Sequence, residues 1–256
     1  SSVTRFQWTS DFNIGFNRNR VTELYGGKPE LKGLKRLEEG RDMDEWYLRE
    51  WAGVDPANGS PLWYTTDGNG KRTTTDSYNK ADRVYCGSAA PKFTGGWMNS
   101  FSYKGFTLTA NFDFVYGNLL YNQSRELLDS DGAYADYNSM KLKSGWKRWE
   151  KEGDIATHPK AINGGNKNSN KSSSRYLEKG NYFSLRNLSL GYSIPEKLCG
   201  KLGLQRVNVS CSADNLFTLT PFSGVSPQLS DSSTDGYAGT IYPLSRRIVL
   251  GLNVSF

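Results

Sequence analysis

The chain has 256 residues, of which 36% are hydrophobic and 23% are charged, and its mean hydropathy is −0.64. Its longest uncharged apolar stretch, Ile248 to Leu252, is five residues long, which excludes a protein that crosses a membrane with helices. A membrane barrel is still allowed, because half of each strand of such a barrel faces a polar lumen. The sequence shows no signal-peptide pattern at its start, so we expect either a mature protein or a piece of one.

The net charge of +6 and the pI near 9.1 raise the question of a nucleic-acid partner. Lys and Arg are scattered, however, and acidic residues interrupt them, as in residues 147–154. We therefore interpret the charge as solvated loop surface with membrane lipid head groups as a possible contact, and we expect no nucleic acid.

Alternation of apolar and polar residues predicts eight strands along the chain. In order, they cover residues 5–16, 45–54, 61–66, 93–103, 105–117, 182–194, 205–213 and 246–256. The apolar positions expected to face lipid are Phe106, Leu108, Phe112, Phe114 and Tyr116, then Leu188 and Leu190, then Ile248, Leu250, Leu252 and Val254. Phe183 and Leu185 fall out of phase with Leu188, which predicts a β-bulge near Arg186.

The connections between these strands alternate between short and long. The short ones are residues 55–59, 104–105 and 195–203, the last of which can form a helical turn, and all three fall on the same side as Phe256. The long, polar ones are residues 17–43, 67–92, 118–181 and 217–244. Short turns on one side and long loops on the other are typical of an outer-membrane β-barrel.

Aromatic residues near the strand ends are placed as the two girdles of such a barrel would be. Tyr103, Phe106, Tyr192 and Phe256 would lie at one level and Phe93 and Tyr116 at the other. The sequence therefore predicts an all-β, transmembrane, antiparallel β-barrel.

Two other classes of protein remain open on the alternation alone. One is a self-contained small outer-membrane barrel that acts as an adhesin or a pore. The other is a soluble, secreted carbohydrate-binding β-sandwich, since its strands also have one apolar and one polar face.

Few residues suggest chemistry, and we expect no enzyme, no catalytic residues, no cofactor and no metal. His158 is the only histidine, and it is more typical of an ordinary loop residue than of a ligand. The segment Asp129-Ser-Asp131-Gly132 only partly resembles a calcium loop, and a plain turn is the better interpretation. Cys86, Cys199 and Cys211 are expected to be unpaired.

Three further loop and strand features have structural interpretations. Trp146 and Trp149 could stack on a sugar, but two aromatic residues three apart more often pack a short helix. Residues 164–174 are low in complexity and are expected to be mobile. Asn187, Asn208 and Asn253 are expected to face inward, and the Gly95-Gly96 pair predicts a strand position that needs a small side chain.

Several stretches resemble one transporter family. Residues 90–122, 179–228, which contain Asp214-Asn215-Leu216-Phe217, and 242–256 are similar to the late barrel strands of SusC-like TonB-dependent transporters of Bacteroidetes, and 52–70 matches a segment common in that family. The resemblance implies that residues 1–256 are the C-terminal portion, about the last eight strands, of a 22-stranded plugged barrel in the bacterial outer membrane. It also implies that Leu252, Val254 and Phe256 form the signal read by the barrel-assembly machinery.

The same resemblance implies a function and partners. They are the import of oligosaccharides or oligopeptides with a SusD-like lipoprotein at the extracellular face, driven through TonB, which would contact the N-terminal part of the transporter. The plug and the earlier strands, as the remainder of the same transporter, would be partners of this portion. We expect the long loops 118–181 and 217–244 to contact the lipoprotein or the substrate.

Overall fold

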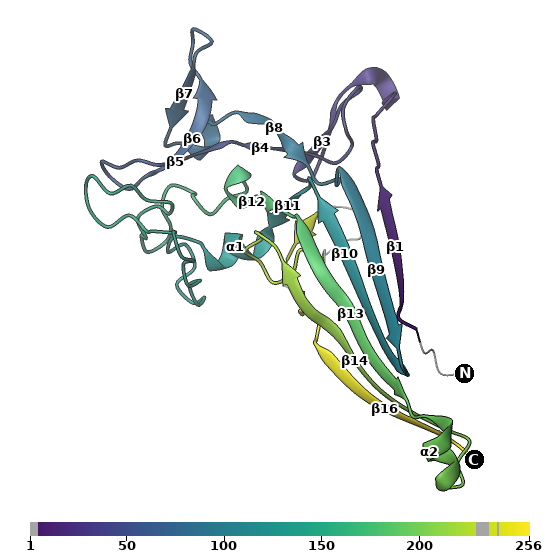
Figure 1. The fold of residues 1–256 in the computed structure, drawn as a ribbon. Helices are drawn as coiled ribbons and strands as arrows, with labels where there is room; N and C mark the ends of the chain where they lie inside the picture. Colours follow the sequence, from purple (N-terminus) through teal and green to yellow (C-terminus); the bar gives the residue numbers. More distant parts are fainter. Residues whose placement is uncertain (1–4, 229–235, 240) are drawn as a thin grey trace.

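The computed structural model describes residues 5–228, 236–239 and 241–256, which form a tall twisted sheet and a broad head at one end of it (Figure 1). The tall sheet, here called the wall sheet, has six antiparallel strands in the order β1-β9-β10-β13-β14-β16. Their bounds are β1 Gln7–Gly15, β9 Phe93–Tyr103, β10 Phe106–Tyr116, β13 Tyr182–Ser193, β14 Arg206–Leu219 and β16 Arg247–Ser255.

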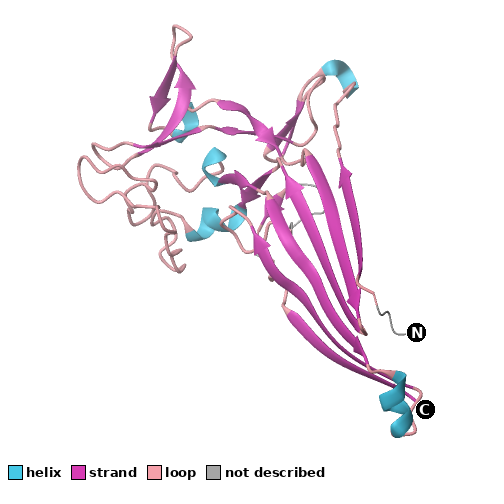
Figure 2. Cartoon of the chain, viewed as in Figure 1, coloured by secondary structure: helices cyan, strands magenta, loops and turns pink. Residues whose placement is uncertain are grey.

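The head consists of residues 17–92, 117–181 and the described part of 220–246. Its short strands, arranged in three small sheets, are β2 Glu30–Lys32, β3 Lys35–Leu37, β4 Glu45–Arg49, β5 Trp51–Val54, β6 Pro61–Thr66, β7 Arg72–Thr75, β8 Arg83–Ser88, β11 Leu119–Asn122, β12 Leu177–Lys179 and β15 Tyr237–Ala238. Helices are few and short (Figure 2): η1 Tyr25–Gly27, η2 Tyr78–Lys80, α1 Gln123–Leu128 and η3 Ser174–Tyr176 in the head, and α2 Glu196–Lys201 at the far end of the wall. No helix in the described ranges has both the length and the apolar character needed to cross a membrane.

The hairpin between β9 and β10 shows how local sequence sets the register of the wall. Lys104 and Gly105 both have positive φ, 46° and 87°, as a two-residue turn of the primed type requires. Phe106 therefore lies opposite Tyr103, and the pairing continues without a break to Tyr116 opposite Phe93. The predicted helical turn in residues 195–203 is also confirmed, as α2.

The predicted bulge near Arg186 is confirmed. The pairing of β13 with β10 shifts between Asn111 and Phe112, and its pairing with β14 shifts between Leu185 and Asn187. On β14 the shift coincides with Asn215, whose φ is +53°. The extra residue brings Phe183 and Leu185 back onto the face that carries Leu188, so the apolar face continues across the bulge.

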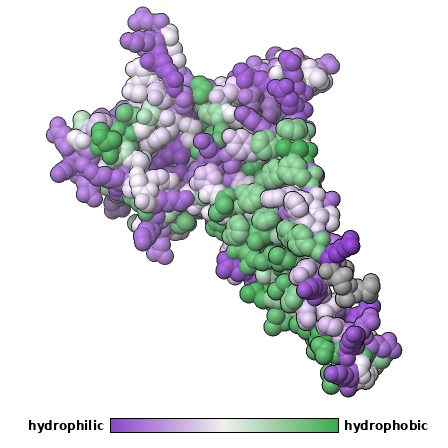
Figure 3. Space-filling model, in the orientation of Figure 1, coloured by the Kyte–Doolittle hydropathy of each residue, from purple (hydrophilic) through white to green (hydrophobic). Residues whose placement is uncertain are grey.

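The wall sheet has one apolar and one polar face. Ile248, Leu250, Leu252 and Val254 of β16 pair with Ala213, Cys211, Val209 and Val207 of β14 on the apolar face. The opposite face carries Thr, Ser, Asn and Asp, and the expected inward-facing Asn208 and Asn253 are direct partners there. In Figure 3 a hydrophobic band covers the strands between the hydrophilic head and the hydrophilic tip at α2.

Neither edge of the wall sheet is closed. β1 pairs only with β9 and β16 pairs only with β14 among the described strands, so the chain does not form a small barrel of its own. A β-sandwich is also contradicted, because a sandwich buries its apolar face against a second sheet, whereas Leu250 is 79% exposed and Phe106 is 52% exposed.

Two of the eight predicted strands do not belong to the wall. Residues 45–54 are divided into β4 and β5, and residues 61–66 form β6, all within small sheets of the head. The turn 55–59 between β5 and β6 therefore lies in the head (Figure 1). The sequence-based prediction that this turn falls on the same side as Phe256 is wrong. The wall portion has six strands instead of eight, and it still alternates long and short connections.

Among the described residues, the clusters of buried hydrophobic side chains lie in the head. Trp46, Leu48, Ala89, Tyr121 and Tyr176 are buried together there, and a smaller cluster joins Leu120, Phe222 and Ala238. These residues come from β4, β11, η3, β15 and the segments that follow β8 and β14, so the core joins the long connections to one another. The long loops are thus folded structure that stands on one end of the wall.

Candidate functional site

The polar face of the wall carries two groups of charged and amide side chains near the head. In the first, Asp113 accepts a hydrogen bond from the Tyr182 hydroxyl at 3.2 Å and forms an ion pair of 3.2 Å with Arg186. Arg186 is the bulge residue, so the irregularity of β13 points a cation at the carboxylate of β10. The arrangement gives the polar face a fixed pattern of charge.

The second group lies on the next strands. Asp214 accepts a hydrogen bond from Asn187 Nδ2 at 2.7 Å and pairs with Arg247 at 2.7 Å. Asn215 beside it donates to the carbonyl of Ser245 at 3.1 Å. The family-like segment 214–217 thus fixes the point where β16 leaves the head, while Phe217 returns to the apolar face opposite Leu185.

The residues predicted to face lipid all lie on the apolar face. Phe106 lies opposite Tyr192 with ring centroids 4.3 Å apart, and Phe93 and Tyr116 stack at 5.1 Å. The two expected aromatic levels are therefore present at the two ends of β10. Gly95 on this face confirms the predicted need for a small side chain, because a Cβ there would lie 2.4 Å from the Phe114 ring. Contact with lipid itself stays a prediction.

The head contains a buried ion network that sequence reasoning missed. Asp129 and Asp131, at 1% and 2% exposure, hold three arginines. Arg125 donates to Asp129 at 2.9 Å, Arg148 donates to Asp131 at 2.7 Å, and Arg175 contacts both carboxylates. Guanidinium groups surround both carboxylates, although Asp129 Oδ1 accepts no hydrogen bond and its nearest arginine nitrogen, from Arg175, is 3.4 Å away. The segment that partly resembles a calcium loop therefore supplies carboxylates to an ion network with arginines.

His158 belongs to the same network and is not an ordinary loop residue. It is 1% exposed, and its Nε2 lies 2.9 Å from Asp129 Oδ2 while its Nδ1 lies 2.8 Å from the Thr157 hydroxyl. Burial by itself would raise the pKa of Asp129, but the hydrogen bond from His158 and the charges of Arg175 and Arg125 outweigh it and lower that pKa. Asp129 therefore stays ionised inside the head.

Trp146 and Trp149 pack the loop, but they do so without the expected helix. Trp149 is buried, and its indole N–H donates to the carbonyl of Pro56 at 2.9 Å. Trp146 lies against Arg125 and His158, with 4.5 Å from its ring to the guanidinium carbon and 5.0 Å between ring centroids. Neither ring offers an open platform for a sugar.

The expectation of a mobile segment at 164–174 is wrong. Asn166, Ser169 and Ser173 are buried, and Asn166 donates to the carbonyls of Gly59 and Lys160 at 3.1 and 2.9 Å. Ser169 donates to Asp131 at 2.7 Å. The polar side chains of this tract satisfy buried groups, which its composition alone does not reveal.

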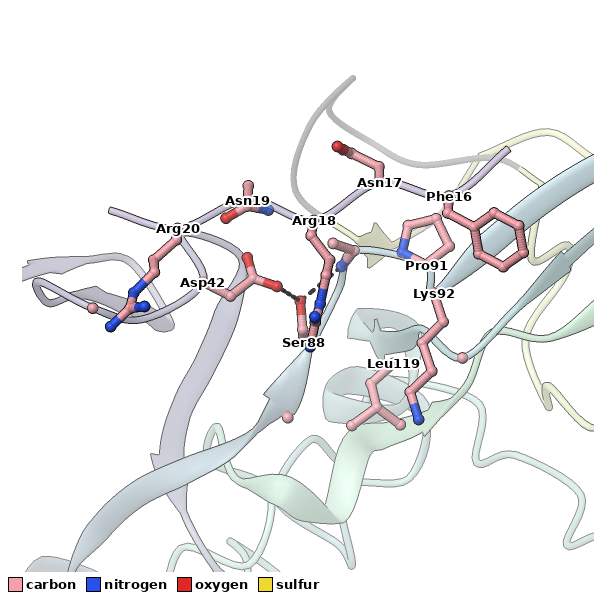
Figure 4. Close-up of a pocket in the computed structure, with 14 residues that line it drawn as sticks. Phe16, Asn17, Arg18, Asn19, Arg20, Asp42, Ser88, Pro91, Lys92 and Leu119 are labelled. Carbon is pink, nitrogen blue, oxygen red and sulfur yellow. Dashed lines mark hydrogen bonds between the residues drawn. The ribbon is translucent and has the colours of Figure 1, made fainter. Parts of the chain in front are cut away.

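A cleft of about 920 Å³ opens where the head meets the top of β1 and β9 (Figure 4). Pairing of these two strands stops at Gly15 opposite Thr94, and residues 16–20 and 87–92 then diverge to form the two sides of the cleft. The Ser88 hydroxyl donates to Asp42 at 2.7 Å on its floor. Arg18, Arg20 and Lys92 line it as well, and sequence reasoning did not single them out.

The amino-acid sequence contains one signal that could have drawn attention to this cleft. Residues 17–20 read Asn-Arg-Asn-Arg directly after the aromatic end of a predicted strand. The other side of the cleft, at residues 87–92, is about 70 positions away in the sequence. Only the fold brings the two segments together.

The chain resembles known proteins over almost its entire length. TonB-dependent receptors P3 and P39 of Formosa agariphila are each 28% identical to it over 98% of the chain. The solved structure of the RagAB peptide transporter has a TM-score of 0.82 at 26% identity over 98% of the chain. The chain is a relative of the TonB-dependent receptors. No protein-family model matches it.

This relationship confirms the recognition made from the sequence, as well as the outer-membrane location. The chain spans 27–29% of the length of the two TonB-dependent receptors and 27% of the RagAB transporter chain. A further RagAB structure, the peptide importer in its open-open state, matches with a TM-score of 0.81 at 25% identity. These relatives carry the names of receptors and transporters, not of enzymes.

Proposed function

We propose that this chain supplies part of the wall and the outer lip of an active transporter that imports nutrients across the outer membrane. The observation that carries the proposal is the two-faced wall sheet with a folded head at one end, in an arrangement that matches the RagAB peptide transporter at a TM-score of 0.82. A sheet with one apolar face and no second layer over that face is suited to contact with hydrocarbon once further strands pair with its edges.

The rest of the proposed transporter closes the barrel. The free edges of β1 and β16 leave backbone N–H and C=O groups without partners, which is costly inside a bilayer. Further strands of the same protein would pair with both edges to give a 22-stranded barrel around a plug, and residues 1–256 would be its C-terminal portion. The polar groups around Asp113 and Asp214 would then face the plugged lumen.

The apolar face would contact lipid through the predicted positions of β10, β13 and β16. Leu252 is 68% and Phe256 is 84% exposed, so both are accessible along the outer side of the last strand. With Val254 they would form the signal that the barrel-assembly machinery reads.

The head would be the extracellular part, where a SusD-like lipoprotein caps the transporter. Its loops 118–181 and 217–244 would contact the lipoprotein or the substrate, although residues 229–235 and 240 of the second loop lie outside the described part. The substrates would be oligopeptides or oligosaccharides, and the peptide-transporting neighbours favour oligopeptides. Energy would come through TonB, contacted by another part of the transporter.

Uptake in living cells tests this function. A strain that lacks the gene should lose uptake of a labelled oligopeptide or oligosaccharide mixture, and the full-length gene should restore it. Inactivation of TonB in the complemented strain should abolish uptake again. Equal uptake with and without the gene, or uptake that is indifferent to TonB, would contradict the proposal.

A further inference from the structure

The cleft between residues 16–20 and 87–92 has an unusual relation to its own backbone. Side chains of a strand alternate between its two faces, so a cavity over one face touches every second residue. This cleft instead touches five consecutive residues, Phe16 to Arg20. It therefore follows the backbone of this segment along its length and is not confined to one side-chain face.

The backbone of this segment is unpaired in the described structure. The ladder of β1 with β9 ends at Gly15, and the next backbone bond is made by Val21, whose N–H donates to Arg41 at 2.8 Å. Residues 16–20 between these points make no backbone–backbone hydrogen bond among the described residues. An extended segment with free donors and acceptors is a template for an added strand.

The opposite side of the cleft cannot fill this role. The N–H groups of Ala89, Ala90 and Lys92 are already bonded to Asp44, Ser88 and Tyr116, and Pro91 has none. The two sides therefore do not pair with each other through backbone hydrogen bonds. The cleft stays open beyond Phe16 and Phe93, whose ring centroids lie 6.0 Å apart.

Three cations determine what the cleft attracts. Arg18, Arg20 and Lys92 form no ion pair with any described carboxylate. The carboxylate on the floor, Asp42, is held by the Ser88 hydroxyl and by the N–H of Asp44 at 2.8 Å. Figure 4 shows Arg18 and Arg20 on one side of their segment and Asn17 on the other, as alternation along an extended chain requires.

We propose that this cleft binds an extended acidic peptide, which pairs with residues 16–20 as an added strand and places carboxylates against Arg18, Arg20 and Lys92. The inference rests on the proposed import function and adds a substrate class and a binding mode to it. Carboxylates on alternate residues of the peptide share one side of its backbone, so their spacing matches that of Arg18 and Arg20. Five extended residues span about 17 Å, so a peptide of roughly that length occupies the free edge.

Binding to the purified full-length transporter tests both parts of the proposal. The probe is a fluorescent acidic pentapeptide, Glu-Val-Glu-Val-Glu. The neutral control peptide of the same length is Gln-Val-Gln-Val-Gln. In the triple variant Arg18→Gln, Arg20→Gln, Lys92→Gln we expect binding of the acidic peptide to weaken by about tenfold or more, and binding of the neutral peptide to change by less than about twofold. Fluorescence anisotropy measures both affinities.

Two further peptides test whether backbone hydrogen bonds of the peptide contribute to binding. Alternate amides of a strand point to the same edge, so N-methylation of the odd or of the even residues of the acidic peptide blocks one edge at a time. One of these two peptides should lose binding and the other should keep it. If both methylated peptides bind as well as the parent, strand addition is wrong.

The matched control is Lys32→Gln, an exposed cation of β2 outside the cleft, which should leave all four affinities unchanged. An equal loss of acidic and neutral peptide in the triple variant, or no loss, would overturn the charge assignment. If the wild-type transporter binds none of the peptides while the uptake assay shows import of another nutrient, the inference fails and the import function stands. Loss of the uptake phenotype itself would instead remove the proposed function.

Discussion

The wall and the head are built from one chain on opposite principles. In the head Trp46 is fully buried and charged groups such as Arg175 and Asp131 are enclosed with it. In the wall Leu250 is 79% exposed and no second layer covers it. Buried side-chain contacts therefore stabilise the head. The wall is stabilised by backbone hydrogen bonds between its strands and by the medium that surrounds its apolar face. In the proposed transporter that medium is lipid.

The largest expected difference in stability between the head and the wall comes from a substitution in the ion network of the head. Arg175→Met removes the guanidinium that joins Asp131 and Asp129 and leaves buried carboxylates with fewer partners. Removal of one partner from a buried pair costs about 3–5 kcal/mol, so the head should loosen while the wall stays folded. Limited proteolysis of the full-length transporter should cut residues 118–181, and the heat-dependent gel shift of the barrel should persist.

Lys167→Met is the control for this change. Lys167 pairs with Asp76 on the surface, where its side chain is 47% exposed, so its loss should cost less than about 1 kcal/mol. A head in the Arg175 variant that resists protease as well as this control does would mean that the network contributes little.

A charge on the wall should distinguish its two faces. Leu250→Lys places an ammonium on the apolar face and should cost about 2–4 kcal/mol near the middle of a bilayer. Val249→Lys lies on the same strand at nearly the same depth but on the polar face, and should cost much less. Urea unfolding of the full-length transporter in lipid vesicles measures both, and equal costs would count against a lipid-facing surface.

Acid should loosen the head before it affects the wall. The hydrogen bond from Lys147, together with the N–H groups of Glu150 and Lys151, lowers the pKa of Asp154 to about 2 from an ordinary 3.8, and the pKa of Asp129 is also lowered. Carboxylates with lowered pKa stabilise the fold fully above about pH 4, and this contribution is lost as the pH falls through the folded-state values.

Hydrogen exchange between pH 4 and pH 2, corrected for the intrinsic rate, measures this effect. Protection in residues 146–160 should fall, and protection in residues 106–116 should not. Asp154→Asn lacks the carboxylate at every pH, so its protection in residues 146–160 should depend less on pH. Parallel loss of protection in both regions would show that the wall titrates with the head.

The sequence predicted the wall well because the signal there is local. β9 runs from Phe93 to Tyr103 as expected, and the phase slip between Leu185 and Leu188 was enough to place the bulge. In the head the same alternation was misleading. Residues 45–54 and 61–66 alternate as membrane strands do, but they form short pieces that pack around Trp46 and Trp63.

The head and the cleft were beyond sequence reasoning for a physical reason. Asp129 is joined to His158 and Arg175 across 29 and 46 positions, and the pairing of a particular carboxylate with a particular cation depends on the whole fold. Residues 164–174 are polar and would be expected to be solvated, yet Ser169 is fully buried and donates a hydrogen bond to Asp131. Polarity in a sequence therefore predicts hydrogen bonding more reliably than it predicts exposure.

The smallest expected effect concerns Asn215, at the point where the pairing of β13 with β14 shifts. Its φ of +53° is unfavourable for most residues by about 1–2 kcal/mol, whereas Gly adopts it freely. Asn215→Ala should therefore lower the urea midpoint more than Asn215→Gly does. Both variants lose the hydrogen bond to the carbonyl of Ser245, so the difference between them isolates the backbone. Ser210→Ala, on the same strand, should match the wild type. An Ala variant as stable as the Gly variant would mean that the backbone at the bulge adjusts without loss of stability. The pairing of β13 with β14, and not Asn215, would then determine the position of the bulge.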